Sequence, residues 1–464
     1  MEQFLEQVRK SLKIKAPLDD AFIPVSQFIK VFEKEAEEKS AFPVAISIER
    51  SGGLITTFKT ICLADQAVYQ DLNIFYIERI VKSLIWTYGG FNVKIGAPLY
   101  IGEAIKRQYT TGGLREFDFD FVNTVYKQTL TIEAVEYENV PASVKYSNPI
   151  GRNFDGCRLG FDAGGSDLKI SAVLDGKAVF SKEVVWQPKI QSDPEYHFKY
   201  IVDVLKEGAS HLPRVDAVGI SSAGIYIDNH TVLASLFIKV SKEDFDAKIR
   251  DIYIRAVKTL GDNIPVEIAN DGDVTALAGA INLEDTNVLG IAMGTSEAAG
   301  FVDAGSNITG WLNELAFVPC DLNRNAMIDE WSGDYGCGVK YFSQDAVIKL
   351  APAVGISFAA NMTPSEKLKY VQGLIGKDPS ADKIFQTIGV YLGYGLAYYS
   401  KLYDIKHVLI LGRVTSGAGG HIILDEAEKV LSAEFPSIKI VLHLPDESAR
   451  RVGQSIAAAS LPKI

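Results

Sequence analysis

The sequence predicts an α/β fold with largely buried sheets, and two observations carry that prediction. After residue 150, short apolar strands alternate with helical patterns and run into polar or glycine-containing turns: RLGFDA, AVGISSAG, VEIAN, VLGIAMG and HVLILG. Continuous apolar strands interspersed with helices are typical of layered α/β domains. The length of 464 residues exceeds that of one ordinary compact domain and indicates two or three.

Residues 1–150 form a unit of a different kind. The join at 143–158 is polar and contains a proline and two glycines, as expected of a connection. Two strands within 44–60 flank Ser51-Gly52-Gly53 and predict a hairpin. The apolar residues of 75–88 have helical spacing and end at Gly89-Gly90, a helix-stop signal. Two alternatives stay open: a degenerate half-copy of the later architecture, or an unrelated α+β accessory region.

Charge and hydropathy exclude several classes of protein. Acidic residues outnumber basic ones by 58 to 47, for a net charge of −11, which argues against a chain that coats nucleic acid. We find no apolar run of about 18 residues and no uninterrupted apolar segment at the start, so we expect a cytoplasmic protein without a membrane partner. Four scattered cysteines, without metal or redox spacing, are expected to be reduced thiols: Cys62, Cys157, Cys320 and Cys337.

A hairpin at 159–169 has the features of a phosphate loop. An apolar strand ends at Asp162, and a double glycine and a hydroxyl residue follow: Gly164, Gly165 and Ser166. Two glycines let backbone N–H groups approach a phosphate, and Ser166 adds a donor. Asp162 can hold Mg²⁺ directly or through water. The alternative is an ordinary tight turn.

A second hairpin and an Asn-Asp pair complete the pattern. The strand at 288–293 is followed by Gly294, Thr295 and Ser296, so an apolar strand again leads into glycine and hydroxyl residues, as in the first hairpin. Between the hairpins, a buried strand delivers Asn270-Asp271 directly before a helix of small residues. A carboxylate at that place can serve as a general base towards a hydroxyl nucleophile. The alternative role of Asp271 is that of a helix N-cap.

These three segments, in this order, resemble the ROK family of repressors and sugar kinases, which are actin-like. The family has an Asp-x-Gly-Gly-Thr hairpin, an Asn-Asp pair and a Gly-Thr-Gly hairpin. The resemblance covers residues from about 157 to 464 and implies a two-lobed actin-like (ribonuclease H-like) ATPase fold. It divides the chain into an accessory region (1–150), an N-lobe (151–280) and a C-lobe (281–464), with the last helix as a candidate to return to the N-lobe.

The family's sugar-binding stretch is altered in this chain. Glu314 is kept, which implies a contact with a substrate hydroxyl, and Asn270 is expected to orient the substrate. Phe317 replaces a histidine and Val339 replaces a sugar-contacting glutamate. Neither side chain can hydrogen-bond a hydroxyl, so we expect a substrate other than glucose held in the usual way. Of the family's zinc-binding cysteines only Cys337 remains, so we expect no structural zinc.

Two further positions bear on nucleotide binding. At the family's adenosine loop Gly412 is kept, and Arg413 replaces the second glycine, so that it either reaches a phosphate or closes the pocket. Glu297 follows the second hairpin and would repel ATP unless it points away or binds Mg²⁺.

The resemblance therefore implies ATP- and Mg²⁺-dependent phosphotransfer to a sugar or sugar-like hydroxyl, with Asp271 as base, and a homodimer. The alternative is a catalytically weak or inactive sugar or nucleotide sensor. A DNA-binding repressor is disfavoured by the net charge and by the absence of a helix-turn-helix pattern near the N-terminus. We therefore expect no nucleic-acid partner.

Overall fold

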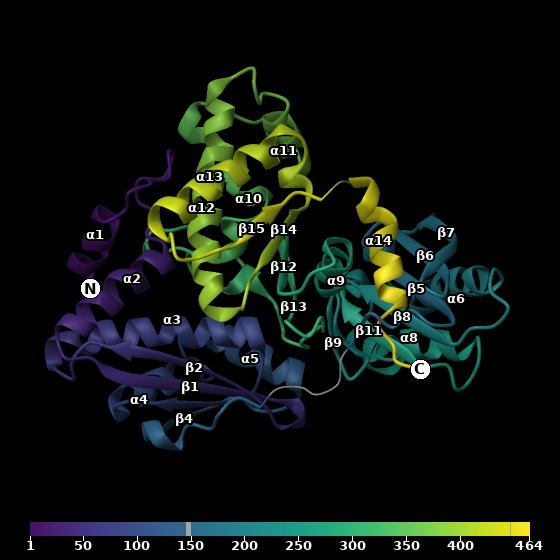
Figure 1. Cartoon of the computed structure of the whole chain (residues 1–464), viewed down its shortest axis with the longest axis horizontal. Coiled ribbons are helices and arrows are strands. Elements are labelled where there is room, and N and C mark those ends of the chain that lie inside the picture. The colour runs from purple at the N-terminus through teal and green to yellow at the C-terminus, as the bar shows by residue number, and fades with distance from the viewer. Residues whose placement is uncertain (145–149, 446) are drawn as a thin grey trace.

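The computed structural model describes residues 1–144, 150–445 and 447–464, the segment 447–452 by its backbone alone. Three main sheets, of four, five and four strands, organise an N-terminal region and two lobes (Figure 1). Within the described residues, no helix has both the length and the apolar character that a membrane span requires.

The N-terminal region packs helices around a four-stranded sheet. The predicted hairpin is confirmed, since Arg50 pairs with Leu54 across the glycine turn. The predicted helix ends at Tyr88, where Gly89 adopts a φ of 73°. The elements are α1 (Glu2–Lys10), α2 (Val25–Glu38), β1 (Phe42–Arg50), β2 (Leu54–Cys62), α3 (Gln70–Tyr88), β3 (Asn92–Gly96), α4 (Leu99–Gln108), α5 (Glu116–Tyr126) and β4 (Thr131–Val135).

The topology of this first sheet separates the two alternatives for the N-terminal region. Its strand order is β2-β1-β3-β4, with β1 antiparallel to β3. The C-lobe sheet has the analogous order β13-β12-β14-β15, but there β12 is parallel to β14. The central pairs of the two sheets therefore differ in direction, which favours an α+β accessory unit over a half-copy.

The N-lobe is built on the order β11-β8-β5-β6-β7. Helix α6 packs over Leu159 and Ile170, and α14 covers the opposite face, where a Cβ on Gly160 would lie 1.7 Å from the carbonyl oxygen of Ser455. The elements are β5 (Cys157–Ala163), β6 (Asp167–Leu174), β7 (Lys177–Val185), α6 (Pro194–Ala209), β8 (Ala217–Ser222), β9 (Ile225–Ile227), β10 (His230–Leu233), α7 (Lys242–Asp244), α8 (Ile252–Lys258), β11 (Val266–Asn270), α9 (Asp271–Leu283) and α14 (Glu447–Ala459).

The C-lobe lies against the N-terminal region (Figure 1). One continuous apolar core joins the two, a second core fills the N-lobe, and a third lies around α9, β12 and α14. The division at residue 150 therefore stays an interpretation of the sequence. The C-lobe elements are β12 (Val288–Met293), β13 (Glu297–Val302), α10 (Gln344–Leu350), α11 (Pro364–Gln372), α12 (Pro379–Leu402), β14 (His407–Leu411), α13 (Ala418–Glu434) and β15 (Val441–His443).

Helix α12 supplies much of the contact between the C-lobe and the N-terminal region. Its buried tyrosines pack there, and the rings of Tyr391 and Phe22 are 4.7 Å apart. The hydroxyl of Tyr391 donates to Asp19 at 2.6 Å, and that of Tyr394 donates to the carbonyl of Ile14 at 2.8 Å. These tyrosines are structural residues that stabilise the contact between the N-terminal region and the C-lobe.

Candidate active site

The predicted phosphate hairpins and the predicted base lie on elements that meet at the junction of the lobes. The first hairpin joins β5 to β6, the second joins β12 to β13, and Asn270-Asp271 lies where β11 meets α9. A cavity of about 180 Å³ is lined by residues of α9, β12, β13, β14 and α14. Asp271 and Gly412 both line this cavity, so the structure brings the candidate base and the candidate adenosine loop together.

Asn270 caps helix α9. Its Oδ1 accepts a hydrogen bond from the backbone N–H of Gly272 at 2.8 Å, and its Nδ2 donates to the carbonyl of Gly224 at 2.7 Å. The capping role that the sequence left open for Asp271 thus belongs to Asn270. Both polar atoms of its amide are thus hydrogen-bonded within the protein, and Asn270 orients the start of the helix. Its contact with a substrate stays a prediction.

Asp271 is the first residue of α9. Its Oδ1 accepts a hydrogen bond of 3.0 Å from the backbone N–H of Gly272. Burial, and then the negative charge of Asp162, raise the pKa of Asp271 to about 6. A carboxylate with that pKa is mostly ionised at neutral pH and is a stronger base than an ordinary aspartate. The arrangement suits proton transfer from a hydroxyl.

Asp162 lies at the end of β5 and is 3% exposed. Its Oδ1 accepts a hydrogen bond from Ser221 at 2.7 Å, and its Oδ2 pairs with Lys169 Nζ at 3.2 Å. Mg²⁺ commonly keeps several waters and takes one or two carboxylates beside substrate phosphates. The residues fit an ion that Asp162 holds through water, because both carboxylate oxygens already have protein partners.

The first hairpin uses several of its polar groups in hydrogen bonds to neighbouring residues. The N–H of Gly164 donates to the carbonyl of Asp167 at 2.9 Å, so this donor is used within the turn and does not face a phosphate. Trp186 Nε1 donates to the Gly164 carbonyl at 2.8 Å, and Ser166 Oγ donates to the Asp167 carboxylate at 2.8 Å. Gly165 packs near Lys189. Phosphate binding by this hairpin stays a prediction.

A cationic side chain lies beside the second hairpin. Arg413 Nη2 lies 3.5 Å from Thr295 Oγ1, and Nη1 donates to Ser365 Oγ at 3.2 Å. Gly412 has a φ of 100°, and a Cβ there would lie 2.3 Å from the carbonyl oxygen of Met293, so this position requires glycine. The glycine lets β14 end close to β12. Of the two roles left open for Arg413, its place beside Thr295 favours a contact with phosphate.

Glu297 points away from the second hairpin. Its side chain is 3% exposed, and its Oε1 accepts a hydrogen bond of 3.4 Å from the hydroxyl of Tyr399 on α12. Burial, and then the charge of Glu314, raise the pKa of Glu297 to about 8, so the carboxyl is largely protonated at neutral pH. The expected repulsion of ATP is therefore removed.

The predicted substrate residues lie beside the N-terminal region. Burial, and then the charges of Asp271 and Asp273, raise the pKa of Glu314 to about 7. The ring of Phe317 stacks on Trp86 of α3 with centroids 4.2 Å apart. The accessory region thus adjoins the candidate acceptor site, a contact that the sequence did not predict.

The family's zinc position does not fit a zinc ion here. Cys337 Sγ has Ser332 Oγ and the carbonyl oxygen of Asp334 as neighbours, each at 3.9 Å, and burial raises the pKa of the thiol to about 12. Zinc in such sites takes about four nitrogen or sulfur ligands, with thiolates as the sulfur donors. In the part of the chain that the structure describes, no group of three metal-ligating side chains occurs.

Two parts of the site were missed by the sequence reasoning. Lys169 pairs directly opposite Asp162 in the hairpin register, which a symmetric turn centred between Gly165 and Ser166 would have indicated. Asp273 Oδ1 accepts hydrogen bonds from the N–H of Phe301 at 3.2 Å and from Asn313 Nδ2 at 2.8 Å. This contact joins α9 to the segment that carries Glu314, and no local pattern signals it.

Comparison with known families decides the assignment. The model of the ROK family matches residues 158–449, which is more than half of the chain. The protein belongs to the ROK family. The expected two-lobed actin-like fold is thereby confirmed. No curated protein sequence matches the chain.

Among solved structures, this ROK protein is similar to a Streptomyces griseus ROK glucokinase in complex with glucose and AMPPNP, at 20% identity over 65% of this chain and 98% of that one, with a TM-score of 0.47. It is similar to a Thermus thermophilus ROK hexokinase, at 18% identity over 65% and 97%, with a TM-score of 0.49. A ROK transcriptional regulator, described as a homolog of the E. coli MLC protein, matches at 18% identity over 66% and 79%, with a TM-score of 0.49. The family thus includes both kinases and regulators.

Proposed function

We propose that the protein transfers a phosphoryl group from ATP to a hydroxyl of a sugar or sugar-like acceptor. The observation that carries the proposal is the cavity shared by Asp271 and Gly412; Arg413, which follows Gly412 in the chain, lies next to Thr295. Phosphoryl transfer needs a base for the attacking hydroxyl and a positive charge near the phosphates. Asp271, with its raised pKa, and Arg413, beside the second hairpin, would supply them. Family membership supports the same reaction class.

The residues divide the work between acceptor and nucleotide. Asp271 takes the proton of the attacking hydroxyl, and Glu314 hydrogen-bonds a second acceptor group. Gly294, Thr295 and Arg413 hold phosphate oxygens, while Gly412 lets the adenosine loop approach. Asp162 would hold Mg²⁺ through water, and the ion would neutralise charge on the phosphates. Catalysis then depends mainly on positioning and on charge stabilisation.

A sugar or nucleotide sensor is the second candidate. The ring of Phe317 stacks on Trp86 and has no polar group that could hydrogen-bond a sugar. This favours a site that no longer recognises sugar hydroxyls at this position. Calorimetry with ATP·Mg²⁺, followed by assays with a panel of monosaccharides and amino sugars, separates the two candidates. A kinase binds the nucleotide and forms a phosphorylated acceptor, whereas a sensor forms no product.

The pH dependence of the reaction should report Asp271. Because its pKa is raised to about 6, the base loses its negative charge as the pH falls through that value. We expect kcat/KM to decline about tenfold per pH unit below about pH 6. Steady-state rates from about pH 5 to 8, with circular dichroism to verify folding at each pH, test this. A flat profile would remove Asp271 from the role of base.

Arg413→Met should weaken nucleotide binding. Loss of a charge-assisted hydrogen bond costs about 1.5–3 kcal/mol, which raises the Kd for ATP·Mg²⁺ about 10- to 100-fold. Calorimetry measures this change. Arg324→Met, which removes an exposed arginine paired with Glu2, is the matched control and should leave the Kd unaltered. An unchanged Kd in Arg413→Met would assign Arg413 to closing the pocket instead.

A further inference from the structure

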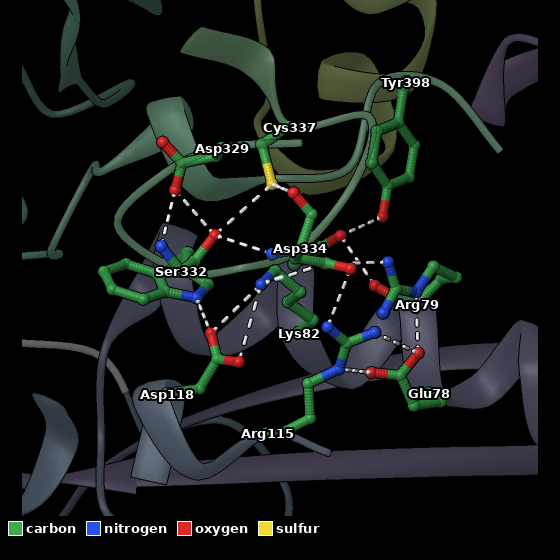
Figure 2. A network of polar contacts seen from close by, with 12 residues as sticks. Glu78, Arg79, Lys82, Arg115, Asp118, Asp329, Ser332, Asp334, Cys337 and Tyr398 are labelled. Atoms are coloured by element: carbon green, nitrogen blue, oxygen red, sulfur yellow. Dashed lines mark hydrogen bonds and ion pairs between the residues drawn. The ribbon is translucent and has the colours of Figure 1, made fainter. Parts of the chain in front are cut away.

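The loop 329–340 is held by the N-terminal region through a buried ionic network (Figure 2). At its centre, the Asp334 carboxylate is contacted by three cations: Arg79 at 2.9 Å, Lys82 at 3.1 Å and Arg115 at 2.8 Å. Arg79 and Lys82 come from α3 and Arg115 immediately precedes α5, whereas Asp334 belongs to the C-lobe. One loop carboxylate thus joins two parts of the molecule.

The network is balanced in charge and withdrawn from solvent. Glu78 accepts from Arg79 Nε at 2.6 Å and from Arg115 Nε at 2.7 Å, and Asp118 pairs with Lys82 at 3.2 Å. Each of the six side chains is at most 5% exposed. Three cations therefore face three anions, which is the condition under which buried charges are tolerated.

The pKa of Asp334 follows from this balance. Burial acts to raise the pKa of its carboxyl, but the charges of Arg79 and Lys82 outweigh burial and hold it below the usual value. Asp334 is therefore ionised throughout the neutral range, and the loop stays attached to α3 and α5.

The restrained loop leads directly to the candidate acceptor site. Asp329 accepts hydrogen bonds from the N–H and the hydroxyl of Ser332, at 2.7 and 2.6 Å, which shapes the turn before Asp334. After Cys337, the N–H of Gly338 donates to the carbonyl of Val318 at 2.9 Å. Near its end, next to Val339, the loop thus contacts the segment that carries Glu314 and Phe317.

We propose that Asp334 is a positioning residue: through Arg79, Lys82 and Arg115 it lets the N-terminal region order the acceptor-binding loop at a place whose side chains do not fit zinc. That the loop binds the acceptor rests on the proposed function. The ordering of the loop by the N-terminal region does not depend on it. The accessory region is then an integral part of the acceptor site, and no metal is needed to order the loop.

Hydrogen exchange of the full-length chain, with mass-spectrometric detection, tests the ordering directly. In Asp334→Asn we expect exchange in 329–340 to rise at least about tenfold, while the N-lobe strands keep their protection. Glu33→Gln is the matched control, because it breaks another ion pair between the N-terminal region and the C-lobe, Glu33–Lys401 at 2.8 Å, away from the loop. EDTA should leave exchange of the wild-type loop unchanged.

Unchanged loop exchange in Asp334→Asn, or a rise in the wild-type loop on adding EDTA, would overturn the proposal. If Asp334→Asn does not fold, Arg115→Lys decides, since it keeps the charge but cannot contact Glu78 and Asp334 together. A local rise in 329–340 then supports the proposal, and no rise overturns it.

The acceptor KM and the Kd for ATP·Mg²⁺ provide a second test, because a purely structural role of Asp334 would not change one without the other. We expect Asp334→Asn to raise the acceptor KM at least about tenfold and to leave the Kd for ATP·Mg²⁺ within about twofold. An equal loss of both affinities would contradict loop positioning. A wild-type protein that phosphorylates no acceptor contradicts the proposed function, whereas the exchange result still decides the ordering of the loop.

Discussion

Asp271→Asn is expected to reduce acceptor phosphorylation by about 10²- to 10⁴-fold, because the amide has nearly the shape of the carboxylate but cannot take a proton. Binding of ATP·Mg²⁺ should persist, since the substitution leaves Thr295 and Arg413, the proposed phosphate contacts, in place. A coupled assay of ADP formation in the presence of acceptor measures the loss, and calorimetry measures nucleotide binding in the same preparation.

Stability separates a chemical effect from misfolding in this variant. The pKa of Asp271 is raised in the folded state, so the folded protein loses stability as the pH rises from about 4 through about 6 and the buried carboxylate ionises. The asparagine avoids that penalty, so its free energy of unfolding at pH 7 should equal or exceed that of the wild type.

The matched control for Asp271→Asn is Glu267→Gln, which neutralises another partly buried carboxyl on β11, the strand that leads into Asp271. It should retain activity within about twofold, because Glu267 does not line the cavity. Asp271→Asn with activity close to that of the wild type would show that another group accepts the proton.

Lys82→Met is expected to have the largest effect on stability. The lysine is fully buried between Asp118 and Asp334, and its removal leaves one negative charge in excess within the network. Removing one partner of a buried pair typically costs about 3–5 kcal/mol. Denaturant unfolding, followed by circular dichroism, measures the free energy of unfolding.

The control for Lys82→Met is Lys182→Met, because Lys182 pairs with Glu207 in an exposed position at 2.7 Å. Exposed pairs contribute about 0–1 kcal/mol, so this variant should be nearly as stable as the wild type. Similar losses in both variants would mean that the buried network does not stabilise the contact between the N-terminal region and the C-lobe.

The sequence predicted those parts of the site that depend on neighbouring residues. Strand–turn–strand patterns located both hairpins, and a buried strand followed by small residues located Asp271 at the start of a helix. Gly412 was identified from the resemblance to the family's adenosine loop, and the structure gives its physical reason, the close approach to Met293. Local backbone requirements leave a local signature in the sequence.

Side-chain direction and long-range contacts could not be predicted in this way. Glu297 follows a phosphate hairpin in the sequence, but the pleat of β13 turns it towards Tyr399 in the core. The network around Asp334 joins residues more than 200 positions apart. One signal was available: Arg79 and Lys82 lie in a helix with apolar residues on every side, which indicates buried charges that need partners.

The most direct test of the account is phosphorus NMR of the wild-type protein with ATP·Mg²⁺ and a panel of monosaccharides and amino sugars. We expect at least one acceptor to yield a phosphorylated product and ADP in equal amounts, and Asp271→Asn to yield neither at a comparable rate. Binding of ATP·Mg²⁺ without a phosphorylated product from any acceptor would contradict the kinase and favour the sensor.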